Sequence, residues 1–249
     1  MDKLSDKETL RYSRHLLLKE VGLEGQLALK AATVAVVGAG GLGSPALLYL
    51  AAAGIGTLIL IDDDGVELSN LQRQVLYKIN HLGQSKVAAA GKVLASLNNQ
   101  IDIVTHCQKL DNNNAAGLLN NADMVLDCSD NFATRYSVNH YCFTHKLPLI
   151  TGAAIASSGQ LMGFDFRQNN SPCYGCVFAK SDATPAVNCS NAGVISPLLG
   201  VVGSMQAQLT LNMLLGHVVG SVFISFDALS LKQQHFKVVK DSNCKECRE

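Results

Sequence analysis

The clearest chemical motif in this sequence is a glycine loop followed by an acid. Residues 38–43 fit the G-x-G-x-x-G pattern, with glycines at Gly38, Gly40, Gly41 and Gly43. The first glycine permits a tight turn, the second lets a phosphate approach the backbone, and the third lets the next helix pack closely. Asp62 lies 22 residues after Gly40, where such folds place the carboxylate that holds a ribose hydroxyl. The motif predicts a nucleotide site and leaves NAD, FAD, S-adenosylmethionine and ATP open.

A polar segment after Asp62 favours a triphosphate among these. It contains Asn70, Arg73 and Gln74, and Lys86 stands at the start of the next expected helix. Arg73 and Lys86 can neutralise phosphate charge. A dinucleotide has only a pyrophosphate, which a helix N-terminus already serves. Judged on charge alone, a solvated surface loop explains these residues equally well.

Asp130 follows an expected strand at an edge where open α/β sheets bind ligands. One carboxylate is enough to hold Mg²⁺ when phosphates supply other ligands. Asp130 could instead cap the helix expected over 131–145. The two roles are compatible.

Four cysteines form two C-x-x-C pairs that could supply a tetrahedral zinc site with no open position for catalysis. They are Cys173, Cys176, Cys244 and Cys247. Zinc would pin the C-terminal tail to the loop after the sixth strand. A redox pair is disfavoured because no thioredoxin-like pattern flanks either copy. Three other cysteines, Cys107, Cys128 and Cys142, fall on expected strands or helices and are interpreted as small core residues.

The elements that must position these residues alternate between strand and helix. After a capping box at Ser5 to Glu8, strands are expected over 33–37, 57–61, 101–105, 123–127 and 147–152, and helices over 43–53, 85–97 and 131–145. Further strands follow over 160–166, 222–226 and 235–239, with a buried helix over 197–215. This order predicts an α/β fold, a Rossmann-like, doubly wound, mostly parallel sheet extended by antiparallel strands, with a zinc-bound C-terminal tail.

Composition excludes several classes of function. The chain has 249 residues, of which 48% are hydrophobic, and its formal net charge is zero. A general nucleic-acid or membrane binder would need an electrostatic driving force that this balance lacks. No apolar segment follows the N-terminus, so no secretory signal is expected and the protein is predicted to be cytoplasmic.

Together these residues resemble the MoeB/ThiF (HesA) family of ubiquitin-activating-like adenylyltransferases over nearly the whole chain. The most specific segments are 38–43, 69–74 and 127–131 together with the two cysteine pairs, and 11–14 is similar to the family's opening helix. The resemblance implies one ThiF-type adenylation domain over 1–249. Its parts would be N-terminal helices 1–31, a nucleotide-binding core 32–152, and a carrier-binding, zinc-bearing portion 153–249.

The resemblance also assigns roles to individual residues. Gly41 would lie against the ATP phosphates, and Asp62 would hold the ribose. The remaining nucleotide contacts would be Asn70, Arg73, Gln74, Lys86, Asp130 (through Mg²⁺) and Asn131, beside Gly38, Gly40 and Gly43. The catalytic set would be Arg73, Lys86 and Asp130, with Arg14 reaching into the neighbouring subunit of a homodimer. Cys189 matches a family cysteine that takes part in sulfur transfer in some members.

The implied reaction is ATP-dependent adenylation of the C-terminal glycine of a ubiquitin-like sulfur-carrier protein that ends in Gly-Gly, with release of pyrophosphate. The molybdopterin synthase small subunit, in molybdenum cofactor biosynthesis, is the preferred carrier, and the thiamin carrier is the alternative. Two hypotheses come from other classes of function. An NAD-dependent oxidoreductase would leave Arg73 and Lys86 unexplained. A non-catalytic scaffold would be expected to lose the Arg or Asp of the ATP site. No rhodanese-like extension follows Cys247. A separate sulfur donor, such as a cysteine desulfurase or rhodanese, is therefore expected.

Overall fold

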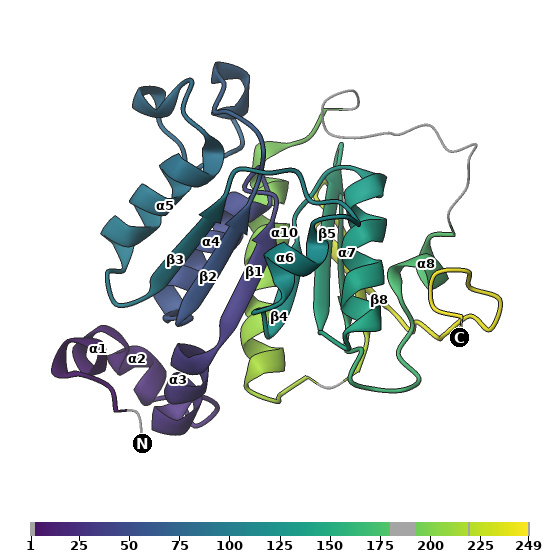
Figure 1. Cartoon of the computed structure of the whole chain (residues 1–249), viewed down its shortest axis with the longest axis horizontal. Coiled ribbons are helices and arrows are strands. Elements are labelled where there is room, and N and C mark those ends of the chain that lie inside the picture. Colours follow the sequence, from purple (N-terminus) through teal and green to yellow (C-terminus); the bar gives the residue numbers. More distant parts are fainter. Residues whose placement is uncertain (1–2, 180–192, 219, 249) are drawn as a thin grey trace.

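The computed structural model describes residues 3–179, 193–218 and 220–248, and its centre is one eight-stranded sheet (Figure 1). The strands are β1 (Thr33–Val37), β2 (Thr57–Ile61), β3 (Asp102–His106), β4 (Met124–Asp127), β5 (Leu149–Ile155), β6 (Ser158–Phe164), β7 (Val222–Asp227) and β8 (Lys232–Phe236). They lie in the order β3-β2-β1-β4-β5-β6-β7-β8. The first five are parallel, and the last three continue the sheet antiparallel from β5.

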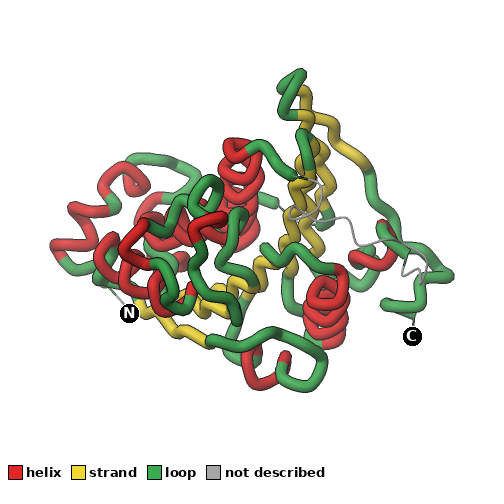
Figure 2. Tube along the Cα trace, turned by 90° about the horizontal axis from the view of Figure 1, so that it is seen from above, coloured by secondary structure: helices red, strands yellow, loops and turns green. Residues whose placement is uncertain are grey.

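Helices flank both faces of the sheet, as Figure 2 shows. The helices within the described ranges are α1 (Asp6–Arg11), α2 (Ser13–Leu16), α3 (Gly22–Ala31), α4 (Gly43–Ala53), α5 (Lys86–Leu97), α6 (Ala115–Leu119), α7 (Phe132–Thr144), α8 (Tyr174–Val177) and α10 (Ser196–Leu214). Two 3₁₀ turns, η1 (Leu68–Asn70) and η2 (Ile79–His81), lie between β2 and α5. The predicted doubly wound fold is confirmed.

Two hydrophobic cores lie on opposite faces of the sheet, and the central strand β1 contributes side chains to both. Its side chains alternate, so Val34 and Val36 pack with α4, α5 and α10, whereas Ala35 and Val37 pack with α6 and α7. A strand that is buried on both faces reads as a continuous apolar run. Because the run at 33–37 is of this kind, the predicted bounds of β1 match the observed ones.

Predicted bounds hold best where local signals are strong. The strand 57–61 and the helix 43–53 are confirmed residue for residue, and α4 ends at Gly54 in the left-handed conformation that favours a helix stop. The last strand was predicted too late, over 235–239. Pairing with β7 sets its true position, because Asp227 lies opposite Lys232 across the hairpin. The helix α3 falls within the expected N-terminal helices 1–31. The helices α6 and α8 were not predicted, and both are so short that packing rather than propensity stabilises them.

The N-terminal helices dock at the amino-terminal ends of the strands, at the lower left of Figure 1. The predicted capping box is confirmed, since Glu8 N–H donates to Ser5 Oγ and Ser5 N–H donates to Glu8 Oε2. Tyr12, buried between α1 and α2, accepts a hydrogen bond from Asn98 Nδ2 at 2.9 Å. The opposite, carboxyl-terminal edge of the sheet is therefore free of these helices.

The apolar segment near the C-terminus is α10, which packs on α4 and β5 inside the fold, as the sequence predicts. Within the described ranges, none of the helices combines the length and the apolar character that crossing a membrane requires.

Gly54 provides a test of how the N-terminal helices are docked. Its φ is +84°, and an added β carbon would overlap the ring of Tyr12. We expect Gly54→Ala to lower the free energy of unfolding by roughly 2–4 kcal/mol, from backbone strain together with overpacking. Urea denaturation measures the loss.

Gly83→Ala is the matched control. Gly83 also has a positive φ, +78°, but nothing lies within 4 Å of its added β carbon. Backbone strain alone should lower the free energy of unfolding of Gly83→Ala by about 1–2 kcal/mol. Equal losses in the two variants would contradict the close packing of Tyr12 on Gly54.

Candidate functional site

A cavity of about 560 Å³ lies at the carboxyl-terminal ends of β1, β2 and β4. The chain runs from β1 outward to β3 and then returns to β4 on the other side of β1, so the cavity sits where the strand order reverses. Open α/β sheets bind ligands at such a switch point, and the volume suits a nucleotide-sized ligand. Nine of the predicted nucleotide residues line it: Gly38, Gly40, Gly41, Asp62, Arg73, Gln74, Lys86, Asp130 and Asn131.

The glycine loop has the geometry that its spacing predicts. Gly38 adopts a φ of +93°, and a β carbon there would press on the carbonyl group of Cys128. A β carbon at Gly43 would overlap the carbonyl oxygen of Gly38. At Gly40 the nearest atom would be Gln74 Nε2 at 3.7 Å, so the backbone there faces the cavity with room to spare.

Tyr77 holds the loop from behind, a role that the sequence analysis missed. Its hydroxyl donates to the carbonyl of Ala39 at 2.7 Å. Burial raises the pKa of Tyr77 well above its ordinary value, and the carboxylates of Asp62 and Asp64 raise that pKa further. The phenol therefore stays protonated and remains a donor.

Asp62 is tied to the same loop. Its Oδ2 accepts the N–H of Ala39 at 2.7 Å, and its Oδ1 accepts that of Asp64 at 2.9 Å. Burial raises the pKa of the Asp62 carboxyl, an effect opposed by the nearby Lys86 and by the two N–H donors. The acid is thus fixed at the end of β2, beside the glycine loop.

Two cations face the cavity. Lys86 Nζ lies 2.8 Å from Asp64 Oδ2, and the Lys86 side chain is 6% exposed whereas that of Asp64 is 67% exposed. The partner carboxylate is therefore solvated, and the ammonium lies against the cavity wall. Arg73 Nη1 donates to the carbonyl of Ser69 at 3.0 Å, which holds the guanidinium near its own turn. Arg73 and Lys86 thus line the same cavity.

The helix cap near Asp130 differs from the prediction. Asn131 caps α7, because its Oδ1 accepts the N–H of Thr134 at 2.9 Å. The alternative role of Asp130 as this cap is wrong, since the helix starts one residue later than that role requires. Asp130 is exposed at the rim of the cavity, so its carboxylate can meet a ligand.

Three of the predicted residues that the structure describes do not line the cavity. Gly43 packs behind the loop, and Asn70 is buried with Oδ1 accepting the N–H of Glu67 at 3.3 Å. Arg14 is exposed on α2, at the other end of the strands (Figure 1). Cys189 lies outside the described residues.

The remaining cysteines are divided between core and surface. Cys128 and Cys142 are buried, as predicted. Cys107 is exposed, so its assignment to the core is wrong. It follows β3, which is an edge strand with a largely exposed face.

Several residues that line the cavity were not predicted from the sequence: Lys109, Leu110, Arg135, Gln160, Tyr174 and Phe178. Arg135 lies inside α7, and Tyr174 lies between two predicted zinc ligands. Neither position carries a motif of its own. Only the packing of α7 against β5 and α8 brings them to the cavity.

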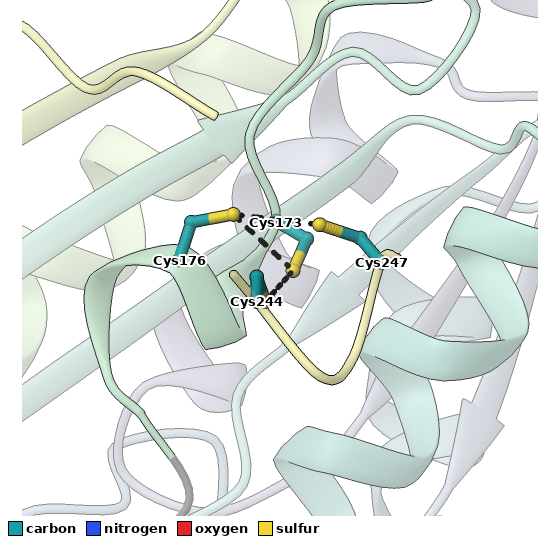
Figure 3. A group of neighbouring side chains, drawn as sticks. All are labelled: Cys173, Cys176, Cys244 and Cys247. Carbon is teal, nitrogen blue, oxygen red and sulfur yellow. Dashed lines mark hydrogen bonds between the residues drawn. The ribbon is translucent and has the colours of Figure 1, made fainter. Parts of the chain in front are cut away.

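The four predicted zinc ligands converge on one point (Figure 3). Their sulfur atoms all lie within 4.8 Å of one another, with Cys173–Cys244 at 3.7 Å, Cys173–Cys176 at 3.8 Å and Cys176–Cys247 at 3.5 Å. Four sulfurs about 2.3 Å from one tetrahedral centre would lie about 3.8 Å apart, whereas a disulfide needs about 2.05 Å. The donor set therefore fits zinc. The cluster joins α8 to the C-terminal segment, which lie side by side in Figure 1.

Fold and cavity together define a Rossmann-like α/β protein with a cavity at the switch point of its sheet and an added four-cysteine cluster. The ThiF family profile matches residues 12–248. The chain belongs to the ThiF family.

Relatives of this chain are of two lengths. It is 42% identical over 249 residues to the molybdopterin-synthase adenylyltransferase of Salmonella typhimurium, with 99% of each chain covered. The corresponding Escherichia coli protein is 41% identical, with the same coverage. The adenylyltransferase and sulfurtransferase MOCS3 of Aedes aegypti is 42% identical over 251 residues, which cover 99% of this chain and 57% of the mosquito protein. The chain thus spans little more than half the length of the insect relatives that it matches.

Solved structures confirm the fold. MccB from E. coli superposes with a TM-score of 0.83 at 22% identity, covering 99% of this chain and 74% of that chain. PaaA superposes with a TM-score of 0.81 at 23% identity, covering 97% of this chain and 76% of that chain.

The cysteine cluster leads to a test by metal analysis. We expect the purified protein to contain about one zinc ion per chain, since four thiolates complete a structural site. Cys247→Ser should lower the zinc content several-fold and reduce the thermal midpoint of unfolding, because zinc binding stabilises the folded state. Cys107→Ser is the control, as it alters an exposed cysteine outside the cluster. A full zinc complement in Cys247→Ser would contradict the assignment.

Proposed function

We propose that this chain uses ATP to adenylate the C-terminal glycine of a ubiquitin-like sulfur-carrier protein, the molybdopterin synthase small subunit, and releases pyrophosphate. The observation that carries the proposal is the convergence of the glycine loop, Arg73, Lys86 and Asp130 on one cavity. The named activity of the bacterial relatives, which match over 99% of their length, supports it.

The cavity suits ATP in a definite orientation. The turn at Gly40 and Gly41, with the start of α4, presents backbone N–H groups to the phosphates. Asp62, held beside this turn, takes the ribose hydroxyls. Lys86 is buried and paired with a solvated carboxylate, so a phosphate oxygen can replace Asp64 as its partner without the ammonium being moved or newly desolvated. Arg73 and Gln74 close the phosphate side.

The chemistry needs charge stabilisation more than proton transfer. A C-terminal carboxylate is already a nucleophile at neutral pH and attacks the α-phosphorus, giving an acyl-adenylate and pyrophosphate. Arg73 and Lys86 hold the phosphates and offset the charge that develops on them. Mg²⁺, when bound through Asp130, supplies further neutralisation of the phosphates. Asn70 is a phosphate contact on the family resemblance, and here its side chain caps the turn at Glu67.

The other proposed parts follow the same division of the chain. Residues 1–249 would form one adenylation domain, with the carrier held by the portion 153–249. Zinc on the four cysteines would be structural. A separate protein would donate sulfur, with Cys189 as the residue on this chain that could take part in the transfer.

The position of Arg14 favours a homodimer. On α2 it lies at the amino-terminal ends of the strands, whereas the cavity lies at their carboxyl-terminal ends. It cannot act on the nucleotide of its own chain in this arrangement. If Arg14 contributes to the reaction, it must do so in the site of a second copy. In a two-fold symmetric dimer, each subunit would then supply its Arg14 to the cavity of the other.

Pyrophosphate release with two purified carriers tests the activity. With the molybdopterin synthase small subunit we expect release that falls at least 100-fold in Arg73→Ala, because removing a charge-stabilising donor costs about that much. Lys92→Ala, on the exposed side of α5, is the matched control and should react normally. Release with the thiamin carrier alone would keep the chemistry and change the carrier. If the protein binds ATP but releases no pyrophosphate with either carrier, the proposed adenylation is rejected.

Mixed dimers test the role of Arg14. Arg14→Ala and Arg73→Ala should each be inactive alone. When the two are co-expressed, half of the dimers are mixed and each has one intact site, so about a quarter of the wild-type activity should return. Size-exclusion chromatography with light scattering verifies the dimer. Absence of recovery in verified mixed dimers would show that Arg14 does not act across the interface.

A further inference from the structure

The zinc segment forms part of the wall of the nucleotide cavity. Tyr174 and Phe178 both line this cavity. Tyr174 is the residue directly after Cys173, and it starts the short helix α8 that carries Cys176. Its ring belongs to the core that contains the four cysteines and also lines the cavity, so a change at the cluster can reach this wall.

Arg135 is the group on which Tyr174 rests. Its guanidinium carbon lies 5.9 Å from the centroid of the Tyr174 ring, within the range of a cation–π contact. Arg135 is buried, and it lines the same cavity. The ring therefore covers a face of the guanidinium that would otherwise be open to water.

Arg135 in turn holds the loop that carries Asp130. Its Nη2 donates to the carbonyl of Ser129 at 2.6 Å and to that of Gly152 at 2.7 Å, and its Nη1 donates to Thr151 Oγ1 at 2.9 Å. These bonds join the end of β4 to β5. Because Ser129 directly precedes Asp130, the rigidity of this guanidinium decides how well the proposed Mg²⁺ residue is positioned.

A buried carboxylate completes the network. Thr151 Oγ1 donates to Asp127 Oδ2 at 3.0 Å, and the backbone N–H and hydroxyl of Ser129 both donate to Asp127 Oδ1. Asp127 and Arg135 are both buried, and no direct ion pair joins them among the described residues. Hydrogen bonds through Thr151 and Ser129 connect the two charged groups. In such a polar network, the loss of one member weakens the hydrogen bonds of the others.

Three further contacts fasten α7 to the zinc segment. Asn139 Oδ1 accepts the backbone N–H of Tyr174 at 2.8 Å, and the hydroxyl of Tyr136 donates to the carbonyl of Phe178 at 2.8 Å. The rings of Tyr136 and Tyr174 meet edge to face at 5.6 Å. Successive turns of one helix thus contact the metal segment, and the start of that helix carries Asn131 in the cavity.

We propose that Tyr174 is a positioning residue through which the four-cysteine zinc cluster sets the affinity of the cavity for ATP. With the cluster formed, the ring is held on Arg135, and Arg135 holds the loop Ser129–Asn131. Without it, the ring is released, water reaches the guanidinium, and the loop loosens. The inference rests on the proposed function, and it gives the cluster a role in nucleotide binding beyond joining the C-terminal segment to α8.

The test compares Tyr174→Leu with Phe143→Leu. The first keeps an apolar side chain and removes the ring face from Arg135. The second removes a ring from the same helix-facing core, where Phe143 contacts Phe166 at 5.6 Å, and Phe143 does not line the cavity. Zinc content, ATP binding by calorimetry, and hydrogen exchange of the segment 127–135 are measured in each variant, with and without zinc chelation.

We expect Tyr174→Leu to retain zinc, to bind ATP about tenfold more weakly, as the loss of one desolvated cation–π contact implies, and to exchange faster over 127–135. Phe143→Leu should match the wild-type protein in all three measurements. Removing zinc with a chelator should weaken ATP binding by a similar factor in the wild-type protein. It should cause little further weakening in Tyr174→Leu, because zinc removal and the substitution both act through the contact between Tyr174 and Arg135.

Full ATP affinity in Tyr174→Leu at full zinc content would overturn the proposal. So would a chelation effect of equal size in Tyr174→Leu and the wild-type protein. If Tyr174→Leu loses zinc, Arg135→Lys replaces it, since this variant leaves α8 intact and should make ATP binding insensitive to chelation. Failure of the zinc-loaded wild-type protein to bind ATP would reject the proposed function instead, and hydrogen exchange would still test the coupling.

Discussion

The close approach of α4 to the end of β1 is the constraint on which the rest of the site depends. A β carbon at Gly43 would overlap the carbonyl oxygen of Gly38, and one at Gly38 would press on Cys128. Three chain segments, β1, β4 and α4, can meet at this distance only because two glycines lack side chains. Their meeting point is also the switch point of the sheet, so the same contact that packs the fold opens the cavity beside it.

Charges around the cavity are arranged in two different ways. Lys86 is buried and pairs with a carboxylate that remains in water, which leaves the ammonium able to change partners. Arg135 is buried with its hydrogen bonds directed to backbone carbonyls and to Thr151, which leaves it fixed. Removing a partner from a buried charge is costly. The first arrangement therefore suits a group that binds ligand, and the second suits one that holds the shape of the site.

Strand β5, where the parallel part of the sheet meets the antiparallel part, links the four-cysteine cluster to this arrangement. Strand β5 pairs with β4 on one side and β6 on the other, and its residues Thr151 and Gly152 receive hydrogen bonds from Arg135. The cluster at Cys173 and Cys244 lies in the same core as α7. The cavity and the four-cysteine cluster thus share one helix and one layer of packing, rather than occupying separate parts of the molecule.

Sequence alone was sufficient to predict the alternation of strands and helices, the bounds of β1, β2 and α4, and the convergence of Gly38, Asp62, Arg73 and Lys86. These features depend on periodicity, glycine spacing and the rule that parallel strands end at one edge, all of which are local or topological. The convergence of two cysteine pairs about 70 residues apart was also predicted, because metal coordination dictates its own geometry.

Only the tertiary structure decided the roles of Asn131, Tyr77, Arg135 and Tyr174. Asn131 rather than Asp130 caps α7, a choice that residue preference leaves open because Asn and Asp are equally good caps. Cys107 is exposed because β3 is an edge strand, and the bounds of β8 follow from its pairing with β7. The positions of Arg135 and Tyr174 on one cavity depend on the packing of α7 against β5 and α8, a long-range contact that leaves no periodic signal in the sequence.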